Sequence, residues 1–109
     1  MTPATLPLPE DWRAAAVARQ VLAEPSGDHR LQDLSRRHAV GRRTLERIFR
    51  DETGMSFGLW KQKARLSDAV RLLAKGKSVT DTALDTGYAS VSAFIAAFKR
   101  TFGCTPGRW

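Results

Sequence analysis

The sequence contains a single cysteine and no long hydrophobic run. Cys104 has no second cysteine with which to form an internal disulfide, which is typical of proteins in a reducing compartment. No stretch approaches the roughly 18 consecutive apolar residues of a membrane-spanning helix. Residues 1–9 lack the charged and apolar regions of a secretory signal. We therefore expect a cytoplasmic protein without a membrane segment.

The residues that enzymes and metal sites require are also scarce. The two histidines, His29 and His38, are not accompanied by other candidate ligands, and one cysteine does not make a zinc site. The chain has no cluster of acids, no nucleophile beside a base and no glycine-rich phosphate loop. We expect no enzymatic activity, no metal and no cofactor, and we interpret both histidines as surface or turn residues.

Positive charge, by contrast, is abundant. The 109 residues carry a formal net charge of +7, with 42% hydrophobic and 27% charged residues. These fractions indicate a globular domain with one modest core rather than a disordered tail. The excess of lysine and arginine favours a polyanionic partner such as nucleic acid.

The N-terminal residues predict an irregular segment followed by a helix. Residues 1–10 contain three prolines and are interpreted as a flexible arm or linker. A helical pattern then begins at Asp11, the expected N-cap, and continues to Leu22, before Pro25. We expect Trp12 to anchor the start of this helix in the core.

The next residues predict a helix, a short turn and a second helix. The first helix begins near Leu31 with Asp28 as its expected N-cap, and residues 39–41 form the turn. The second helix covers residues 42–53 and ends at Gly54, since glycine tolerates the left-handed backbone of a helix end. This order is that of a helix-turn-helix unit.

The helix over residues 42–53 has two contrasting sides. Its apolar side consists of Leu45, Ile48 and Phe49. Its other side carries charged residues, namely Arg42, Arg43, Glu46, Arg47 and Arg50. Such a helix can enter a DNA major groove, although a basic, solvent-facing side is the simpler interpretation of one helix taken alone.

A long helix and a second pair of helices follow. We expect Ser56 to cap a helix that continues to about Lys75, which makes it about 30 Å long. Ser78 then caps a short helix that ends near Gly87. Ser90 caps the next helix, over residues 91–102, which Gly103 ends before a final turn at residues 105–106.

The second pair of helices repeats the first. Val79 and Thr82 match Leu31 and Leu34 at an offset of 48 in the numbering. After the turn the offset is 49, and it matches Leu45 with Phe94, Phe49 with Phe98, Arg50 with Lys99, Gly54 with Gly103, Ser56 with Thr105 and Trp60 with Trp109. One additional residue in the second turn explains the change. The pattern predicts two helix-turn-helix units in tandem.

We therefore predict an all-α fold of two helix-turn-helix subdomains, homeodomain-like and with about seven helices in all. The expected boundaries are an arm over 1–10, a first subdomain over 11–56, a linker helix over 57–76 and a second subdomain over 77–109. Successive major grooves on one face of B-DNA recur about every 34 Å, close to the expected length of the linker helix. One monomer would then fill two grooves.

Two stretches carry a family resemblance: RRTLERIFRDETGMS in the first unit and GYASVSAFIAAFKRTFGCTPGRW in the second. From about Leu31 to Trp109 the chain resembles the DNA-binding domain of AraC/XylS-type bacterial transcription regulators. The resemblance implies two helical lobes that bind asymmetric double-stranded DNA sites and usually activate transcription with RNA polymerase. Such regulators often carry an upstream effector-binding or dimerisation domain, to which residues 1–10 could be a linker.

The resemblance also implies positions that meet bases. In the first unit these are Arg43, Glu46 and Arg47. In the second unit they are Val91, Ser92, Ile95 and Ala96. Several relatives carry long polar or basic side chains at the second set of positions, so this chain departs from the family pattern there.

The chemistry of the first set suggests roles for each residue. Arg43 and Arg47 are four residues apart and project together, so either could contact O6 and N7 of guanine. Glu46 could accept from the cytosine amino group, or orient Arg43 or Arg50 through a salt bridge, which we favour. We expect Arg42 and Arg50 to contact phosphates.

The second set leaves two interpretations open. Ser92 could hydrogen-bond to a base or a phosphate, and Ile95 and Ala96 could touch thymine methyl groups. Alternatively Ile95 is only a packing residue and this helix reads no bases. Our hypothesis is that the first unit supplies most specificity, while the second positions the protein through phosphate contacts from Ser90, Lys99, Arg100 and Arg108.

Three functions compete. The first is a sequence-specific regulator that binds double-stranded DNA, and we expect an activator. The second is a basic helical module that docks an acidic protein, and a weaker third is an RNA-binding protein. The tandem repeat favours the first, because protein docking does not require a repeat spaced by one turn of DNA.

Overall fold

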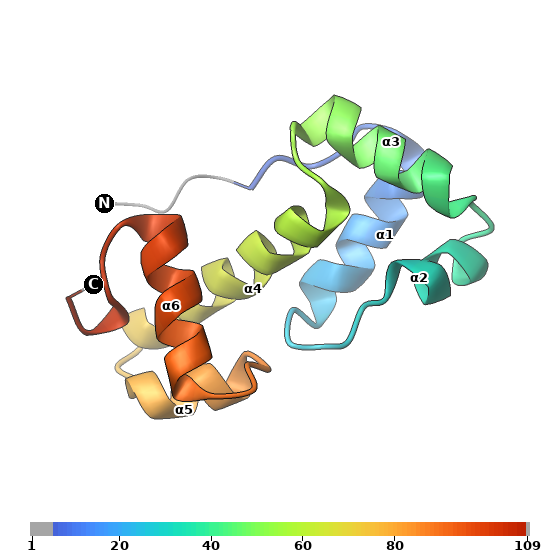
Figure 1. Cartoon of the computed structure of the whole chain (residues 1–109). Helices are drawn as coiled ribbons and strands as arrows, with labels where there is room; N and C mark the ends of the chain where they lie inside the picture. Colours follow the sequence, from blue (N-terminus) through green and yellow to red (C-terminus); the bar gives the residue numbers. More distant parts are fainter. Residues whose placement is uncertain (1–5, 109) are drawn as a thin grey trace. The chain divides into compact units, whose positions relative to one another are not determined.

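The computed structural model describes residues 6–108, and over these residues it contains six α-helices, one short 3-10 helix and no strand (Figure 1). The helices are α1 (Trp12–Ala23), α2 (Leu31–Arg37), α3 (Arg42–Thr53), α4 (Phe57–Ala74), α5 (Val79–Asp85), α6 (Val91–Phe102) and the 3-10 helix η1 (Pro106–Arg108). The all-α prediction is confirmed, and the expected count of about seven includes the 3-10 helix.

Side-chain caps fix the starts of most of these helices. The Asp11 carboxylate accepts hydrogen bonds from the backbone N–H of Arg13 at 2.9 Å and of Ala14 at 3.4 Å. The hydroxyls of three serines do the same for the later helices, at distances of 3.0 to 3.2 Å: Ser56 for α4, Ser78 for α5 and Ser90 for α6. These four predicted caps are confirmed.

The predicted cap of α2 is wrong. Arg30, not Asp28, occupies the N-cap position, and no side chain caps the helix. The Asp28 carboxylate instead accepts a hydrogen bond from Nε of Arg30 at 3.1 Å. Asp28 lies two residues too early in the chain to reach the free N–H groups of the first turn.

The chain divides into two compact units inside α4, between Ala64 and Arg65. Each unit has a core of its own. The first unit buries Ala14, Val17, Ala18, Val21, Leu34, Val40, Leu45, Ile48, Phe49, Phe57, Trp60 and Ala64. The second unit buries Leu66, Ala69, Val70, Ala83, Phe94, Ala97 and Phe98. The two halves of α4 therefore serve different cores.

Three aromatic side chains form the centre of the first core. The ring of Phe49 packs edge-on against Phe57, with centroids 5.1 Å apart, and against Trp60 at 5.3 Å. Trp60 is fully buried. Trp12, in contrast, is 76% exposed, so the prediction that it anchors the core is wrong. The buried side of α1 consists of Ala14, Val17, Ala18 and Val21, and the helical period places Trp12 on the opposite side of the helix.

Residues 6–10 pack against the first unit and are not a free arm. Leu6 packs against the core and Pro9 is buried. The indole Nε1–H of Trp60 donates a hydrogen bond to the Pro7 carbonyl at 2.7 Å. The expectation of a flexible arm is thus wrong for residues 6–10, whereas the alternative that they belong to a linker stays a prediction. Residues 1–5 lie outside the described residues.

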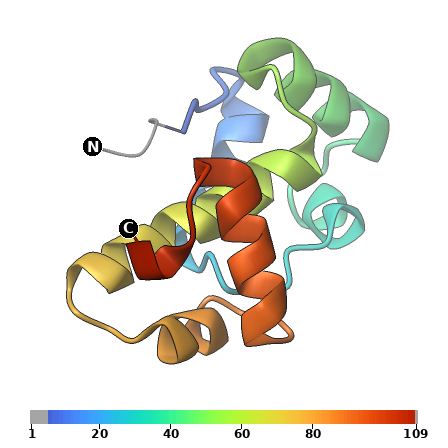
Figure 2. The ribbon, with the colours of Figure 1, turned by 60° about the vertical axis from the view of Figure 1, so that its left-hand side comes forward.

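The predicted repeat is present in the structure. The shorter helices α2 and α5 both have seven residues, and the longer helices α3 and α6 both have twelve, with the offsets expected from the sequence. Both longer helices end at a glycine with a left-handed backbone, Gly54 at φ 75° and Gly103 at φ 79°. Figure 2 shows the second pair, α5 and α6, joined by their short turn. The expected match of Trp60 with Trp109 lies outside the described residues.

None of the helices in residues 6–108 combines the length and the apolar character that crossing a membrane requires.

Candidate nucleic-acid interface

The apolar side of α3 determines which residues face the solvent. Leu45 and Phe49 are fully buried and Ile48 is 7% exposed. Because these residues recur at intervals of three and four, the opposite side of the helix is turned to solvent. The predicted site residues of the first unit, Arg42, Arg43, Glu46, Arg47 and Arg50, are all exposed.

The arginines on the exposed side of α3 form no close ion pair. None of its four arginines forms an ion pair within 4.0 Å in the part of the chain that the structure describes. Glu46 likewise forms no salt bridge with Arg43 or Arg50 there, so the orienting pair that we favoured is absent from this structure. The guanidinium groups are therefore available to an outside anion, and the Glu46 carboxylate to an outside donor.

α6 carries a row of aromatic rings on the side that packs into the core of the second unit. The centroid of Phe94 lies 5.4 Å from Tyr88 and 5.8 Å from Phe98, and Phe98 lies 4.6 Å from Phe102. Ser92 and Ala96 face the solvent, whereas Ile95 is half-buried and packs against the core. Both interpretations of Ile95 thus have a physical basis, because part of the side chain packs and part is accessible.

The two longer helices differ strongly at equivalent positions. When the two helices are aligned from their first residues, Arg42, Arg43, Glu46 and Arg47 of α3 correspond to Val91, Ser92, Ile95 and Ala96 of α6. Three arginines and a carboxylate are thereby replaced by one hydroxyl and three apolar side chains. Only at the helix end does the charge agree, where Arg50 corresponds to Lys99.

The predicted phosphate contacts of the second unit are exposed in each case. Lys99, Arg100 and Arg108 are solvent-facing and form no ion pair among the described residues. The Ser90 hydroxyl accepts a hydrogen bond from the Ala93 backbone N–H, and its own proton is still available to a phosphate oxygen.

Two further basic residues were not predicted as site residues. Arg36 and Arg37 end α2 immediately before the turn into α3, and both are exposed. In helix-turn-helix proteins the first helix of the pair crosses the DNA backbone. The run of basic residues before the turn was the signal in the sequence.

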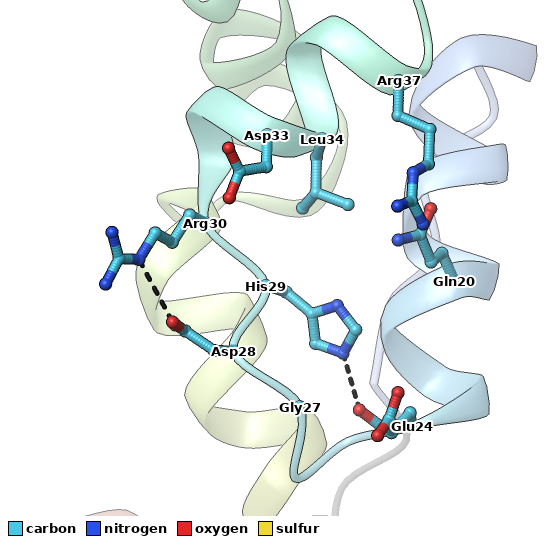
Figure 3. Close-up of a pocket in the computed structure, with 9 residues that line it drawn as sticks. All are labelled: Gln20, Glu24, Gly27, Asp28, His29, Arg30, Asp33, Leu34 and Arg37. Atoms are coloured by element: carbon cyan, nitrogen blue, oxygen red, sulfur yellow. Dashed lines mark hydrogen bonds and ion pairs between the residues drawn. The ribbon is translucent and has the colours of Figure 1, made fainter.

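A cavity of about 260 Å³ lies in the first unit, between the end of α1 and the start of α2 (Figure 3). Its lining is polar, and His29 and Glu24 lie at one side of it. His29 lies in the connection between α1 and α2, as the turn interpretation predicts, but it is buried there, at 7% exposed. Its Nε2 donates a hydrogen bond to the Glu24 carbonyl at 2.6 Å. His38 also has a partner, Gln20 Oε1 at 2.8 Å. No group of three metal-ligating side chains occurs among the described residues.

The comparison with protein families and curated proteins agrees with this arrangement. Residues 34–109 match a family described as a helix-turn-helix domain. The transcriptional regulator RipA of Corynebacterium glutamicum is 36% identical over 102 residues, which cover 94% of this chain and 31% of RipA. The regulator NimR of Escherichia coli is 44% identical over 71 residues, 65% of this chain and 26% of NimR. The chain thus spans a third or less of these relatives.

Solved structures show the same fold. The DNA-binding domain of the global transcriptional factor AdpA, in complex with a target DNA, has a TM-score of 0.79 and 30% identity, with 88% of this chain and 87% of that chain covered. An AraC-type transcriptional regulator from Chromobacterium violaceum has a TM-score of 0.84 and 25% identity, with the same coverage. This chain belongs to the family of AraC-type helix-turn-helix DNA-binding domains of transcription regulators.

Proposed function

We propose that this chain binds double-stranded DNA sequence-specifically and activates transcription, with α3 and α6 inserted into successive major grooves. The observation that carries the proposal is the exposed side of α3, with four arginines that form no ion pair within 4.0 Å among the described residues. The phosphates of DNA present a regular row of negative charge, and arginine side chains that neutralise them supply much of the affinity of DNA-binding proteins.

The roles of the residues on α3 follow from their positions and chemistry. Arg43 and Arg47 lie four residues apart at its centre and present planar donors that match O6 and N7 of guanine. Glu46 lies between them and forms no ion pair among the described residues, so it accepts from the amino group of cytosine or orients an arginine once DNA is bound. Arg42 and Arg50, nearer the ends, hold phosphates, together with Arg36 and Arg37 of α2.

The second unit mainly positions the protein. Ser90, Lys99, Arg100 and Arg108 hold the DNA backbone on either side of α6. Because α6 carries no charged residue where α3 carries four, the first unit supplies most of the sequence preference.

The linking helix suits two grooves. α4 has 18 residues, or about 27 Å at 1.5 Å per residue, and successive grooves on one face of B-DNA recur about every 34 Å. A single chain thus supplies both contacts, and the isolated domain works as a monomer.

The relatives suggest the cellular setting. One of them, RhaR of Mannheimia succiniciproducens, is called a transcriptional activator and is 36% identical over 77 residues, 70% of this chain and 28% of RhaR. By analogy we infer a bacterial, cytoplasmic activator that works with RNA polymerase and with an effector-binding or dimerisation domain outside this chain.

Selection and fluorescence anisotropy test the proposal. Random-sequence duplexes are titrated with the protein at several salt concentrations, and the bound pool is sequenced. We expect binding that weakens steeply with salt and an enriched site of two motifs about one helical turn apart. Binding without an enriched site would contradict sequence specificity. Absence of binding at low salt would contradict DNA binding and favour an acidic protein or an RNA as the partner.

A further inference from the structure

The exposed side of α6 has almost no hydrogen-bonding capacity. Over its first two turns the exposed residues are Ser92, Ala93 and Ala96, and half-buried Val91 and Ile95 flank them. Ser92 is the only one of these five whose side chain can donate or accept a hydrogen bond. The first charged residue is Lys99, in the last turn of the helix.

The chemistry of the major groove restricts what such a surface can recognise. Guanine, adenine and cytosine present only donors and acceptors there, whereas thymine also presents a methyl group. An apolar side chain facing the first three bases leaves their polar groups without partners, but against thymine it buries a methyl group and gains hydrophobic free energy. The small side chains of Ala93 and Ala96 also let the helix approach the groove closely.

We infer that α6 reads its half of the DNA site through the 5-methyl groups of thymine, with Ile95 and Ala96 as the contact residues. This inference rests on the proposed function. The accessible part of Ile95 lies one turn beyond Val91 and next to Ala96, so these side chains form one continuous apolar strip along the helix. The half-buried packing of Ile95 against the core holds the strip in a fixed position.

Replacement of thymine by deoxyuridine tests the inference, because it removes the methyl group and leaves every hydrogen-bonding group in place. The duplex carries the site enriched by selection. The motif bound by α6, called the α6 half, is the one at which the sequence preference is unchanged in the Arg47→Ala variant. We expect each recognised methyl group that is removed to weaken binding about fourfold, the value of one buried methylene-sized group. The same replacement in the α3 half is the control for general effects of deoxyuridine.

Protein variants identify the side chains. In Ile95→Ala and in Ala96→Gly, the loss caused by deoxyuridine in the α6 half should shrink toward onefold. In Ser92→Ala, which changes an exposed hydroxyl and no apolar group, it should persist. For each variant, the affinity for the thymine duplex is compared with that for the deoxyuridine duplex, so a change in protein stability cancels. If Ile95→Ala does not fold, Ala96→Gly provides the test, because Ala96 is exposed.

Two results would overturn the inference while the proposed function stands. One is an enriched α6 half without thymine, and the other is binding that deoxyuridine changes no more in the α6 half than in the α3 half. Failure to enrich any site would instead contradict the proposed function, and this inference would fall with it.

Discussion

Ala39 and Gly87 occupy the same position in the two helix-turn-helix units, and both have a left-handed backbone, with φ of 54° and 83°. Each ends the first helix of its unit in the same way. The N–H of Ala39 bonds to the Arg36 carbonyl at 3.3 Å, and that of Gly87 bonds to the Leu84 carbonyl at 3.1 Å. The next N–H in each turn closes a longer loop, which completes a Schellman motif.

Ala39→Gly should stabilise the first unit. A left-handed backbone costs an L-residue roughly 1–2 kcal/mol, which glycine avoids. Glycine also has more conformational freedom in the unfolded chain, which offsets roughly 0.4–1 kcal/mol of this stabilisation. We expect the free energy of unfolding, measured in urea, to rise by about 0.5–1 kcal/mol. Gly87→Ala is the matched control and should lower it. A loss of stability in Ala39→Gly would contradict the account.

The sequence predicted most of the fold because local signals determine it. Asp11, Ser78 and Ser90 mark helix starts, Gly54 and Gly103 mark helix ends, and the structure uses each as predicted. These signals work over three or four residues, and the helical period then assigns the faces of α3 and α6. The exposed positions of the candidate site could be predicted for the same reason.

The error about residues 6–10 concerns a feature that depends on distant residues. Residues 6–10 were expected to form a free arm, yet they bond to Glu52 and Trp60, which lie far along the chain in α3 and α4. The error about Trp12 is of another kind, because the helical period itself places this residue opposite the buried side of α1. No local pattern distinguishes a proline-rich arm that docks from one that does not.

Trp12→Ala should therefore leave stability nearly unchanged. The side chain is 76% exposed, and substitutions at such positions usually change the free energy of unfolding by less than about 0.5 kcal/mol. Trp60→Phe is the contrasting variant. It leaves a cavity beside Phe49 and removes the hydrogen bond to the Pro7 carbonyl, so we expect a loss of about 2 kcal/mol in urea denaturation. Equal losses in the two variants would contradict the structure.

Glu52→Ala should release the N-terminal segment. One carboxylate oxygen of Glu52 accepts the backbone N–H of Glu10 at 2.6 Å and that of Asp11 at 2.9 Å. Because these groups are exposed to water after the change, the cost should be only about 1 kcal/mol. Asp51→Ala, with the same charge in the same turn of α3, controls for the helix dipole. Limited proteolysis should cut residues 6–10 faster in Glu52→Ala alone, and equal rates would argue against this anchor.

Tyr88→Phe should stabilise the second unit or leave it unchanged at neutral pH. The hydroxyl oxygen is buried and has no hydrogen-bond partner among the described residues, so its removal relieves a desolvation cost. Burial raises the pKa of Tyr88 above its ordinary value of 10.0, although the positive charge of Arg65, whose guanidinium carbon lies 5.5 Å from the ring centroid, opposes the shift.

The raised pKa of Tyr88 gives this prediction a pH dependence. The unfolded chain loses the phenolic proton first as the pH rises, so stability is fully present below about pH 10 and is lost as the pH rises through the folded pKa. Wild type should lose more stability than Tyr88→Phe above pH 10. The chain has one tyrosine, so its ultraviolet absorbance reports the pKa directly, and a midpoint below 10 would contradict the burial of the hydroxyl.

Variants of the α3 arginines should separate base reading from phosphate binding. Arg47→Ala removes a donor pair aimed at guanine, so it should cost about 1–3 kcal/mol on the selected site and relax the preference at one position. Arg50→Ala should weaken binding to every sequence alike and lower the slope of log affinity against log salt by about 0.9. Arg19→Ala, an exposed arginine of α1, removes the same charge elsewhere.

The salt slope and the sequence preference are independent measurements, which is why the three arginine variants together decide the assignment. A general electrostatic effect of net charge would shift all three equally, because each removes one positive charge from the same protein. If the DNA-binding surface includes α3 but not α1, Arg19→Ala should change neither the salt slope nor the sequence preference. If Arg47→Ala lowers the slope but leaves the preference intact, the guanidinium contacts a phosphate, and base reading must be assigned to Arg43 and Glu46.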